Sequence, residues 1–447
     1  MTTIVWFRRD ARLDDNPALA AAVDAGQVCP LFVVDPILWD QASPLRRELL
    51  GAGLVALDRA ITERGGRLRV ERGNPVNVVP AVAREVGAEA VHVNAEITPY
   101  GSTRDAMVGR HCRLVEHEGV YARAPGSVLT NHGELYKVFT PFFERWMDGG
   151  FISGPAPPDI HFTDEPGPGL PDRHQPSLPA GESAAFQRLA AFLERVDTYD
   201  EERDRIDLDS TSHLSVDLKY GWLGARRLIT EVGTGSPGRR AFVRQVAWRD
   251  FYGHLMAAHT EMANRAIDRR FENLAWRNDP AEIAAWKAGQ TGYPTVDAAM
   301  RRLVSEGRMH NRARLVVASF LVKDLLVDWR IGERFFRHHL IDGDVAQNAG
   351  NWQWVAGTGN DAAPYFRVFN PVTQSKRFDP EGRQIRRWVP ELGELPVDML
   401  HAPWESGPLE LLGHGVELGR DYPEPIVDHA MARERAISAY ETARGSL

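Results

Sequence analysis

Short apolar runs alternate with helical segments over the first third of the chain. Residues 3–7 (TIVWF), 28–35 (VCPLFVVD) and 90–94 (AVHVN) are bounded by polar or charged positions, which predicts buried strands. The segment RLRVERG (67–73) continues the alternation between the second and the last of these runs. A helix with Pro17 in its first turn is expected between the first two runs. Strands that alternate with helices of this length predict right-handed crossovers. We therefore expect an α/β domain with a doubly wound parallel sheet over residues 1–130.

The pattern changes further along the chain. Residues 150–182 are dense in Pro and Gly, which predicts a connector, because Pro lacks an amide donor and Gly costs entropy in any regular element. After this stretch apolar residues recur at spacings of three and four, as in FVRQVAWRDFYGHLMAAH and RARLVVASFLVKDLLVDWR. We expect a linker over residues 131–182 and an all-α domain over residues 183–447.

The composition excludes several classes of protein. The hydrophobic fraction of 43% and the charged fraction of 26% are those of a globular protein. Two cysteines, Cys29 and Cys112, cannot build a disulfide framework, and no Cys/His cluster has zinc spacing. Lys323 and Asp324 interrupt the most apolar run before it reaches the ~18 residues that a membrane span needs. We expect a soluble, cytoplasmic monomer.

The net charge of −8 argues against a generally basic nucleic-acid-binding surface. Residues 301–337, however, contain nine Lys/Arg against four Asp/Glu, which is the local balance that phosphate recognition needs. A charged stripe on an amphipathic helix is also typical of a solvated face, so both interpretations stay open on this feature.

Tryptophan is concentrated in the second half of the chain. Nine of the 12 tryptophans lie beyond residue 200. Indoles commonly fill cores, but this concentration also favours a half of the protein that binds a flat aromatic group or moves electrons.

The two common glycine-rich phosphate loops are absent from the sequence, since neither G-x-G-x-x-G after the first strand nor G-x-x-x-x-G-K-[ST] occurs. A ligand of the sheet is therefore expected at the carboxyl ends of the strands, where Arg8, Arg9, Glu96 and Tyr100 would emerge. The hydroxyl residues of STSHLS (210–215) precede helical sequence and could instead hold a pyrophosphate, although such residues cap most helices.

Residues 340–371 form the least ordinary stretch. They place Asp342, Asp344, Asn348 and two tryptophans among glycines, which permit close backbone approach. Metal binding is one interpretation of Asp-x-Asp, but no third acidic ligand follows at calcium-loop spacing, so no metal site is expected. A cradle of hydrogen-bonding groups around a polar aromatic ring, with indoles beside it, is the better interpretation.

These motifs together resemble a known family. VWFRRDARLDDNPAL, STSHLS, QVAWRDFYGHL, TGYPTVDAAMRRL, RMHNRAR, DGDVAQNAGNWQW and TGNDAAPYFRVFNP, in this order, are similar to the photolyase/cryptochrome family, and most similar to its microbial class I cyclobutane pyrimidine dimer photolyases. The resemblance runs essentially end to end. It implies an antenna-binding α/β domain, a long linker and a helical FAD domain, and it implies light-dependent repair of UV-damaged DNA by a deoxyribodipyrimidine photo-lyase.

The resemblance also implies residue roles. Three indoles, Trp276, Trp329 and Trp352, match a relay that carries an electron from the surface to excited flavin. The positions that match FAD contacts are Tyr199, Thr211, Ser212, His213, Leu214, Ser215, Phe242, Arg249, Arg314, Asp342, Gly343, Asp344 and Asn348. The positions that match contacts to DNA or to the flipped dimer are Arg203, Gln245, Trp248, Asn311, Arg312, Trp354, Arg367 and Gln374. Flipping is required because a dimer inside a duplex cannot reach a buried flavin.

A second, antenna chromophore is implied for the N-terminal domain. AEITPYGSTRD (95–105) is more similar to the subgroup that binds 8-hydroxy-deazaflavin than to the one that binds methenyltetrahydrofolate. Arg47 and Glu96 match its contact positions, whereas Thr98 replaces an acidic residue found there.

Two positions depart from the class I pattern and keep alternatives open. Gln245 stands where the family has Glu, and Leu315 stands where it has Met. Gln also occurs there in (6-4) photolyases and animal cryptochromes, but these carry a His pair at the positions of Asn311 and Leu315. A cryptochrome photoreceptor is the main alternative, although the neutral amide of Asn348 matches photolyases. A light-independent flavin oxidoreductase would need a nicotinamide site, which the sequence does not show.

Overall fold

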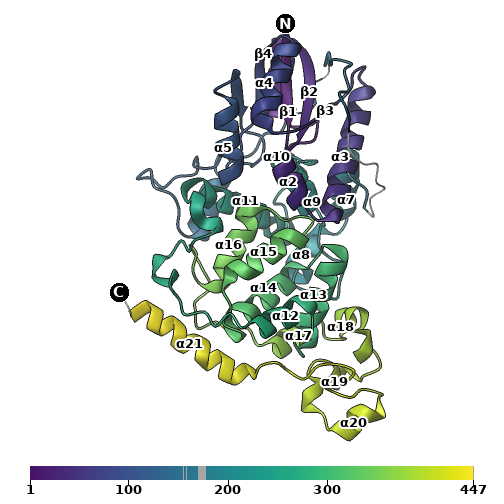
Figure 1. The fold of residues 1–447 in the computed structure, drawn as a ribbon, viewed down its shortest axis with the longest axis vertical. Helices are drawn as coiled ribbons and strands as arrows, with labels where there is room; N and C mark the ends of the chain where they lie inside the picture. The colour runs from purple at the N-terminus through teal and green to yellow at the C-terminus, as the bar shows by residue number, and fades with distance from the viewer. Residues whose placement is uncertain (155, 158, 170–177, 446–447) are drawn as a thin grey trace. The chain divides into compact units, whose positions relative to one another are not determined.

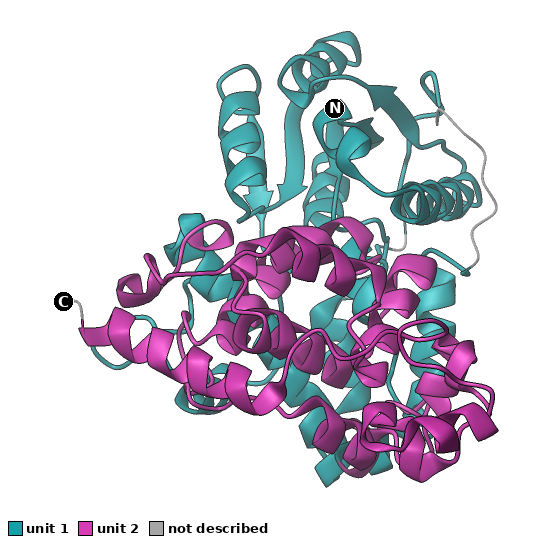
Figure 2. Cartoon of the chain, turned by 60° about the horizontal axis from the view of Figure 1, so that its bottom comes forward, with its two compact units in different colours: residues 1–200, 211–261 teal, residues 201–210, 262–447 magenta. Residues whose placement is uncertain are grey.

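The computed structural model describes residues 1–154, 156–157, 159–169 and 178–445 (Figure 1). Contacts between Cα atoms divide the chain into two compact units (Figure 2). Unit 1 comprises residues 1–200 and 211–261, and unit 2 comprises residues 201–210 and 262–447. Each unit is described by itself below.

Unit 1 contains a parallel five-stranded sheet with the strand order β3-β2-β1-β4-β5. The strands are β1 (Thr2–Phe7), β2 (Gln27–Val34), β3 (Arg69–Arg72), β4 (Ala88–Asn94) and β5 (Leu114–His117). Because β1 lies in the centre and the order reverses beside it, the sheet is doubly wound, as predicted. The short strand β5 was not predicted.

Helices between the strands complete the α/β part of unit 1. They are α1 (Pro17–Ala25), α2 (Pro36–Gln41), α3 (Pro44–Thr62), α4 (Pro75–Glu85) and α5 (Pro99–Val108). The side chain of Asn16 accepts a hydrogen bond from the Leu19 amide, and Pro17 needs no hydrogen bond at the first position, so α1 begins where the sequence indicated. Side chains from β1, β2, β4 and α4 form one buried apolar cluster on the sheet.

The remaining helices of unit 1 include one inside the predicted linker. Helix α6 (Phe139–Met147) buries four aromatic rings, and it packs against α11 (Pro237–Ala258). The other helices are α7 (Glu182–Leu193), α8 (Tyr199–Glu202, at the border of unit 2), α9 (Ser215–Tyr220) and α10 (Ala225–Val232). Residues 155, 158 and 170–177 of the predicted linker lie outside the described residues, and the boundaries at 130 and 182 stay predictions.

The described residues of unit 2 are helical, without a β-strand. Its longer helices are α12 (Pro280–Ala288), α13 (Pro294–Glu306), α14 (Asn311–Ser319), α15 (Trp329–His339), α16 (Val345–Ala356), α17 (Pro371–Phe378) and α21 (His429–Gly445). Shorter helices are the π-helical turn η4 (Phe320–Asp324), α18 (Arg383–Trp388), α19 (Val397–Leu400) and α20 (Pro408–Gly413). Over the described ranges, no helix has both the length and the apolar character that crossing a membrane requires.

Candidate active site

A pocket in unit 2 collects residues from α14, the end of α15, the following loop and α16. Its lining includes Asn311, Arg314, Leu315, Ala318, Phe336, Leu340, Asp342, Gly343, Asp344, Gln347, Asn348, Asn351, Trp352 and Val355. All five unit 2 residues matched to flavin contacts therefore meet at one place. The lining combines one cation, two carboxylates and several carboxamides with apolar side chains.

Arg314 and Asp342 form the charged pair of this pocket. Nη2 of Arg314 donates to both carboxylate oxygens of Asp342, at 3.1 and 2.8 Å. Nε of Arg314 donates to the carbonyl oxygen of Met309 at 2.9 Å, so the guanidinium is held from two sides. The Asp342 side chain is 7% exposed, and a carboxylate so buried needs such a partner.

Asp344 sets the position of α16. Its side chain caps the helix by accepting a hydrogen bond from the Gln347 amide at 3.0 Å. The first turn of α16 then places Asn348 in the pocket wall. Nδ2 of Asn348 donates to the Glu333 side chain at 2.9 Å and to the Glu333 carbonyl oxygen at 2.8 Å. Because these contacts use its donor group, Oδ1 is the acceptor that Asn348 can offer to a ligand.

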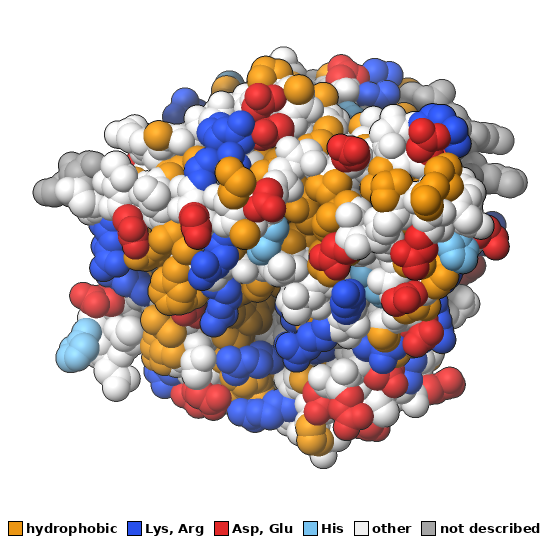
Figure 3. All heavy atoms as spheres, turned by 90° about the horizontal axis from the view of Figure 1, so that it is seen from below, with side chains coloured by type: hydrophobic (Ala, Val, Ile, Leu, Met, Phe, Trp, Pro, Cys, Tyr) orange, Lys and Arg blue, Asp and Glu red, His pale blue; other side chains and the backbone are white. Residues whose placement is uncertain are grey.

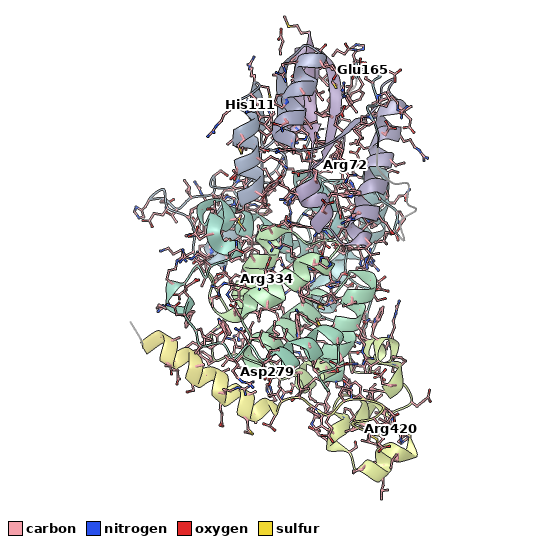
Figure 4. The ribbon with its side chains drawn as sticks, in the orientation of Figure 1. Arg72, His111, Glu165, Asp279, Arg334 and Arg420 are labelled. Atoms are coloured by element: carbon pink, nitrogen blue, oxygen red, sulfur yellow. The ribbon has the colours of Figure 1, made fainter. Side chains whose placement is uncertain are left out.

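Glu333 is a residue that the sequence analysis missed. It lies on α15, is 1% exposed, and has Arg337 at 3.6 Å. Burial raises the pKa of its carboxyl group, while the charge of Arg337 and the hydrogen bond from Asn348 act in the opposite direction. The adjacent Arg334, labelled in Figure 4, is exposed on the same helix. A lone acidic residue on the buried face of an amphipathic helix was the available sequence signal.

The three relay candidates lie in or against one apolar cluster of unit 2. Trp352 lines the pocket, is 2% exposed, and packs on α15 at Gly332, where a Cβ atom would come within 2.1 Å of its ring. Trp329 is fully buried in the same cluster, whereas Trp276 is partly buried at its edge. Trp276 is thus the most exposed of the three indoles. The indole nitrogens of Trp352 and Trp276 are buried without a hydrogen-bond partner.

Of the predicted DNA contacts, Arg312 has the most defined environment. Its Nη2 donates to Asp204 at 2.8 Å, and its guanidinium lies 4.5 Å from the centre of the Phe378 ring. Trp354 and Gln374 are half-buried and Arg203 is partly exposed, while Arg367 is exposed. The face drawn in Figure 3 carries Lys/Arg and Asp/Glu side chains interspersed.

Helix α11 carries the candidate residues of unit 1. The Trp248 ring stacks on Phe139 of α6, with centroids 3.8 Å apart and an angle of 7° between the planes. Arg249 lies 4.5 Å from the centre of the Tyr121 ring. Gln245 is half-buried, and its side-chain nitrogen donates a long hydrogen bond to the Ala241 carbonyl oxygen at 3.4 Å.

The other flavin candidates of unit 1 are Phe242, on the same helix, Tyr199 and residues 211–215. Phe242 packs edge-on against Tyr199, with centroids 5.3 Å apart. In the hydroxyl cluster, Thr211 and Ser212 are partly exposed, Ser215 is exposed, and Leu214 is buried. His213 has a φ of 56°, a left-handed conformation that turns the chain before α9.

The residues expected at the carboxyl ends of the strands do gather there. Arg8 pairs with Asp105, Arg9 pairs with Glu96 at 3.2 Å, and the Tyr100 hydroxyl donates to Asp35. Burial disfavours the charged form of Glu96, but the nearby arginines outweigh this and lower its pKa. Arg47, on α3, donates instead to the carbonyl oxygens of Trp39 and Asp40 at the end of α2, at 2.9 and 3.0 Å.

No group of three or more His, Cys, Asp or Glu side chains arranged for a metal ion occurs within the described ranges.

Comparisons with known proteins agree over the whole chain. Residues 3–159 match the family described as DNA photolyase, and residues 242–442 match the FAD binding domain of DNA photolyase. The deoxyribodipyrimidine photo-lyases of Escherichia coli (40% identical over 475 residues) and Streptomyces griseus (43% over 467 residues) align with 99% of this chain and with 99% of their own length.

The chain belongs to the DNA photolyase family.

The fold of this chain is also similar to the folds of solved structures. A class III photolyase from Agrobacterium tumefaciens has a TM-score of 0.91 at 36% identity, covering 100% of this chain and 98% of its own. A cryptochrome from Synechocystis has the same TM-score at 29% identity, covering 98% of this chain and 99% of its own. An archaeal photolyase from Sulfolobus tokodaii with two FAD molecules has a TM-score of 0.87 at 31% identity, covering 99% and 100%. The predicted family and fold class are confirmed.

Proposed function

We propose that this chain is a deoxyribodipyrimidine photo-lyase, which uses light and FAD to split cyclobutane pyrimidine dimers in DNA. The observation that carries the proposal is the unit 2 pocket, where the Arg314–Asp342 pair, the acceptor side of Asn348 and the Trp352 indole converge in a member of the DNA photolyase family.

The pocket residues suit the flavin ring of FAD. Arg314 and Asp342 offer a donor and acceptor pair in fixed orientation, and Asn348 offers an acceptor held in place by Glu333. Trp352 adds a large aromatic ring to the lining of the pocket. The bound and reduced flavin would supply the electron that splits the dimer, while the protein supplies position and electrostatics.

Several residues remain proposals for the rest of the cofactor. Arg249, Phe242, Tyr199 and the Thr211–Ser215 segment are proposed to contact FAD, with the segment's hydroxyls at the pyrophosphate. Support comes from the match to family motifs and from the partial exposure of Thr211 and Ser212.

DNA binding is proposed for a set of side chains with two tasks. Arg203, Arg312, Arg367 and Gln374 would contact the backbone, and the Arg312 guanidinium is held in place for this by Asp204 and Phe378. The flipped dimer would be contacted by Asn311, Gln245, Trp248 and Trp354. The two tryptophans would replace lost base stacking, which is worth about 1–3 kcal/mol per base on an aromatic ring.

A photoreceptor role is the second candidate, because the cryptochrome from Synechocystis matches the fold as well as a photolyase does. The neutral amide at position 348 favours repair in our proposal. Lesion choice is proposed to be the cyclobutane dimer rather than the (6-4) product, because Asn311 and Leu315 stand where (6-4) enzymes carry a His pair.

An antenna chromophore, 8-hydroxy-deazaflavin rather than methenyltetrahydrofolate, is proposed for unit 1. The polar groups around Glu96 support a ligand at this edge of the sheet. The Sulfolobus tokodaii relative with two FAD molecules makes a flavin another outcome of the test. Purification from a host that makes deazaflavin and folate, followed by mass spectrometry of the released ligand, identifies the chromophore.

The deciding experiment measures repair of an oligonucleotide with one thymine dimer, under blue light and in darkness, by enzyme with chemically reduced flavin. We expect repair in light only. Binding without repair under both conditions would favour the photoreceptor, and repair of a (6-4) oligonucleotide alone would overturn the lesion choice.

A further inference from the structure

A lysine without a counter-ion is buried in the middle of unit 2. Lys323 is 0% exposed and lies in the π-helical turn η4, all five residues of which are buried. Its Nζ donates to the carbonyl oxygen of Ala356, the last residue of α16, at 3.2 Å. Among the described side chains, no carboxylate lies within ion-pair distance of this nitrogen. Burial of an unpaired ammonium is costly, so its retention calls for a physical reason.

The neighbouring Asp324 does not compensate Lys323, because it is engaged by the C-terminal helix. Its side chain pairs with His429 at 2.5 Å, and its carbonyl oxygen accepts from Arg435, both on α21. Helix α21, the long yellow helix of Figure 1, thus supplies the partners of Asp324, and the charge of Lys323 is not neutralised by its neighbour.

The lysine contacts an aromatic ring of the same helix. Nζ of Lys323 lies 3.6 Å from the centre of the Tyr440 ring. The Tyr440 hydroxyl donates to the Ala356 carbonyl oxygen at 2.6 Å, so both groups share one acceptor. The Tyr440 ring in turn packs edge-on against Trp276, with centroids 6.3 Å apart and an angle of 87°. One ring therefore separates the charge of Lys323 from the outermost relay candidate.

We propose that Lys323 controls how readily Trp276 loses an electron, and so controls the rate at which the tryptophan relay refills the flavin. The inference rests on the relay role of Trp276 in the proposed function. A positive charge close to an indole opposes formation of the indole radical cation, and the opposition is strong in a buried, low-dielectric environment. Removal of the charge therefore makes electron loss from Trp276 easier.

Trp276 passes one electron inward to oxidised Trp329, which has replaced the electron given by Trp352. The oxidised Trp276 is then reduced by one electron from an external thiol. Each thiol that reacts also releases one proton, and two oxidised thiols join as one disulfide. Lys323 takes no part in the electron path and acts only through its charge.

The charge of Lys323 is expected to change within the working pH range. Burial lowers the pKa of its ammonium group to about 7. The groups that face it or its neighbour are Asp324 in the same turn, Tyr440, His429 and Arg435 on α21, and Tyr293 at the start of α13. His429 pairs with Asp324, so its contribution needs its own variant.

The test compares Lys323→Met with wild-type holoenzyme and with Lys287→Met, a control lysine that lies over the Phe335 ring. Photoreduction with an added thiol and the decay of the tryptophan radical in transient absorption are measured from pH 6 to pH 9. Wild type and control should photoreduce faster as pH rises, with a midpoint near the pKa of Lys323. Lys323→Met should show the fast rate at every pH, about tenfold above wild type at pH 6.

A second readout does not depend on the flavin. A lysine with a lowered native pKa makes the unfolding free energy rise with pH between that value and its ordinary pKa, and this rise should vanish in Lys323→Met apoprotein. His429→Gln should keep the pH profile of photoreduction. An unchanged profile in Lys323→Met, or its loss in His429→Gln, would overturn the inference. Failure of Trp276→Phe to slow photoreduction would instead overturn the relay itself.

Discussion

Asn348 and Glu333 are joined by two hydrogen bonds, both donated by the same amide nitrogen of Asn348. One reaches the Glu333 side chain and the other its backbone, so the carboxamide has a single orientation. This arrangement explains how a neutral side chain can present a defined acceptor to a ligand in a pocket of mixed polarity.

Glu333→Ala should release this orientation. We expect a loss of about 1–3 kcal/mol of unfolding free energy, because a buried donor loses one of its two acceptors, and a shift in the midpoint potential of bound flavin. Urea unfolding and reductive titration measure the two effects. Glu333→Gln keeps an acceptor and should be milder, and Arg334→Ala, on the exposed side of α15, should behave as wild type. Equal potentials in all three variants would contradict the positioning role.

Gly332→Ala should displace Trp352. The new Cβ atom would lie within 2.1 Å of the indole ring, and overpacking of this kind costs about 1–3 kcal/mol. Gly413→Ala is the control, since nothing lies within 4 Å of the corresponding Cβ position on α20. We expect lower thermal stability and slower flavin photoreduction only in Gly332→Ala. A variant as stable as wild type would mean that Trp352 can move aside without cost.

Asp250→Asn tests a pH dependence of unit 1. Burial raises the pKa of Asp250 to about 6, although Arg249 and the donors Arg123 and Trp146 act in the opposite direction. The native state therefore binds more protons than the unfolded state between about pH 4 and 6, and the stabilisation is lost as pH rises through 6. The variant should lack this slope, worth about 2–3 kcal/mol, in urea unfolding between pH 4 and 7. The same dependence of unfolding free energy on pH in both proteins would contradict the raised pKa of Asp250.

Arg367→Ala tests contact with the DNA backbone. Each phosphate contact contributes about 0.9 to the slope of log K against log salt concentration, so the variant should bind more weakly and with a slope lower by about one. Arg420, labelled in Figure 4, pairs with Asp421 at 2.8 Å and serves as the control. Fluorescence anisotropy between 50 and 200 mM salt measures both slopes. The same decrease for Arg420→Ala would indicate a general charge effect.

Gln245→Glu tests the departure from the class I pattern. A neutral hydrogen bond to the dimer, worth about 0.5–1.5 kcal/mol, is already available from Gln245, so the variant should bind as well and repair equally or slightly better. The measurement is the quantum yield of dimer repair per absorbed photon, taken across pH for both proteins with saturating dimer substrate. A large loss at every pH would show a site built around an amide and would favour another lesion or a sensory role.

Strands β1, β2 and β4 could be predicted because they are apolar runs with clear boundaries. Two elements could not. Strand β5 has only four residues and little apolar character, and α6 combines aromatic residues with Pro141, which favours extended structure locally. Packing of α6 against α11 overrides this preference.

The pocket was predictable for a different reason. Asp342, Asp344, Asn348 and Trp352 lie in one short stretch, and the family motif covers it. Glu333 and Lys323 were not predicted as site residues, because their importance comes from distant partners. Only the folded chain shows which carbonyl or ring each of them meets.

Helix α16 is fixed at both ends. Asp344 caps its first turn, and the carbonyl oxygen of Ala356 accepts hydrogen bonds from Lys323 and Tyr440 at the other end. A helix anchored in this way changes little when charge moves beside it, so Asn348 and Trp352 add little nuclear reorganisation energy to an electron transfer. Electron transfer beside α16 is therefore expected to stay fast in cold, viscous solution.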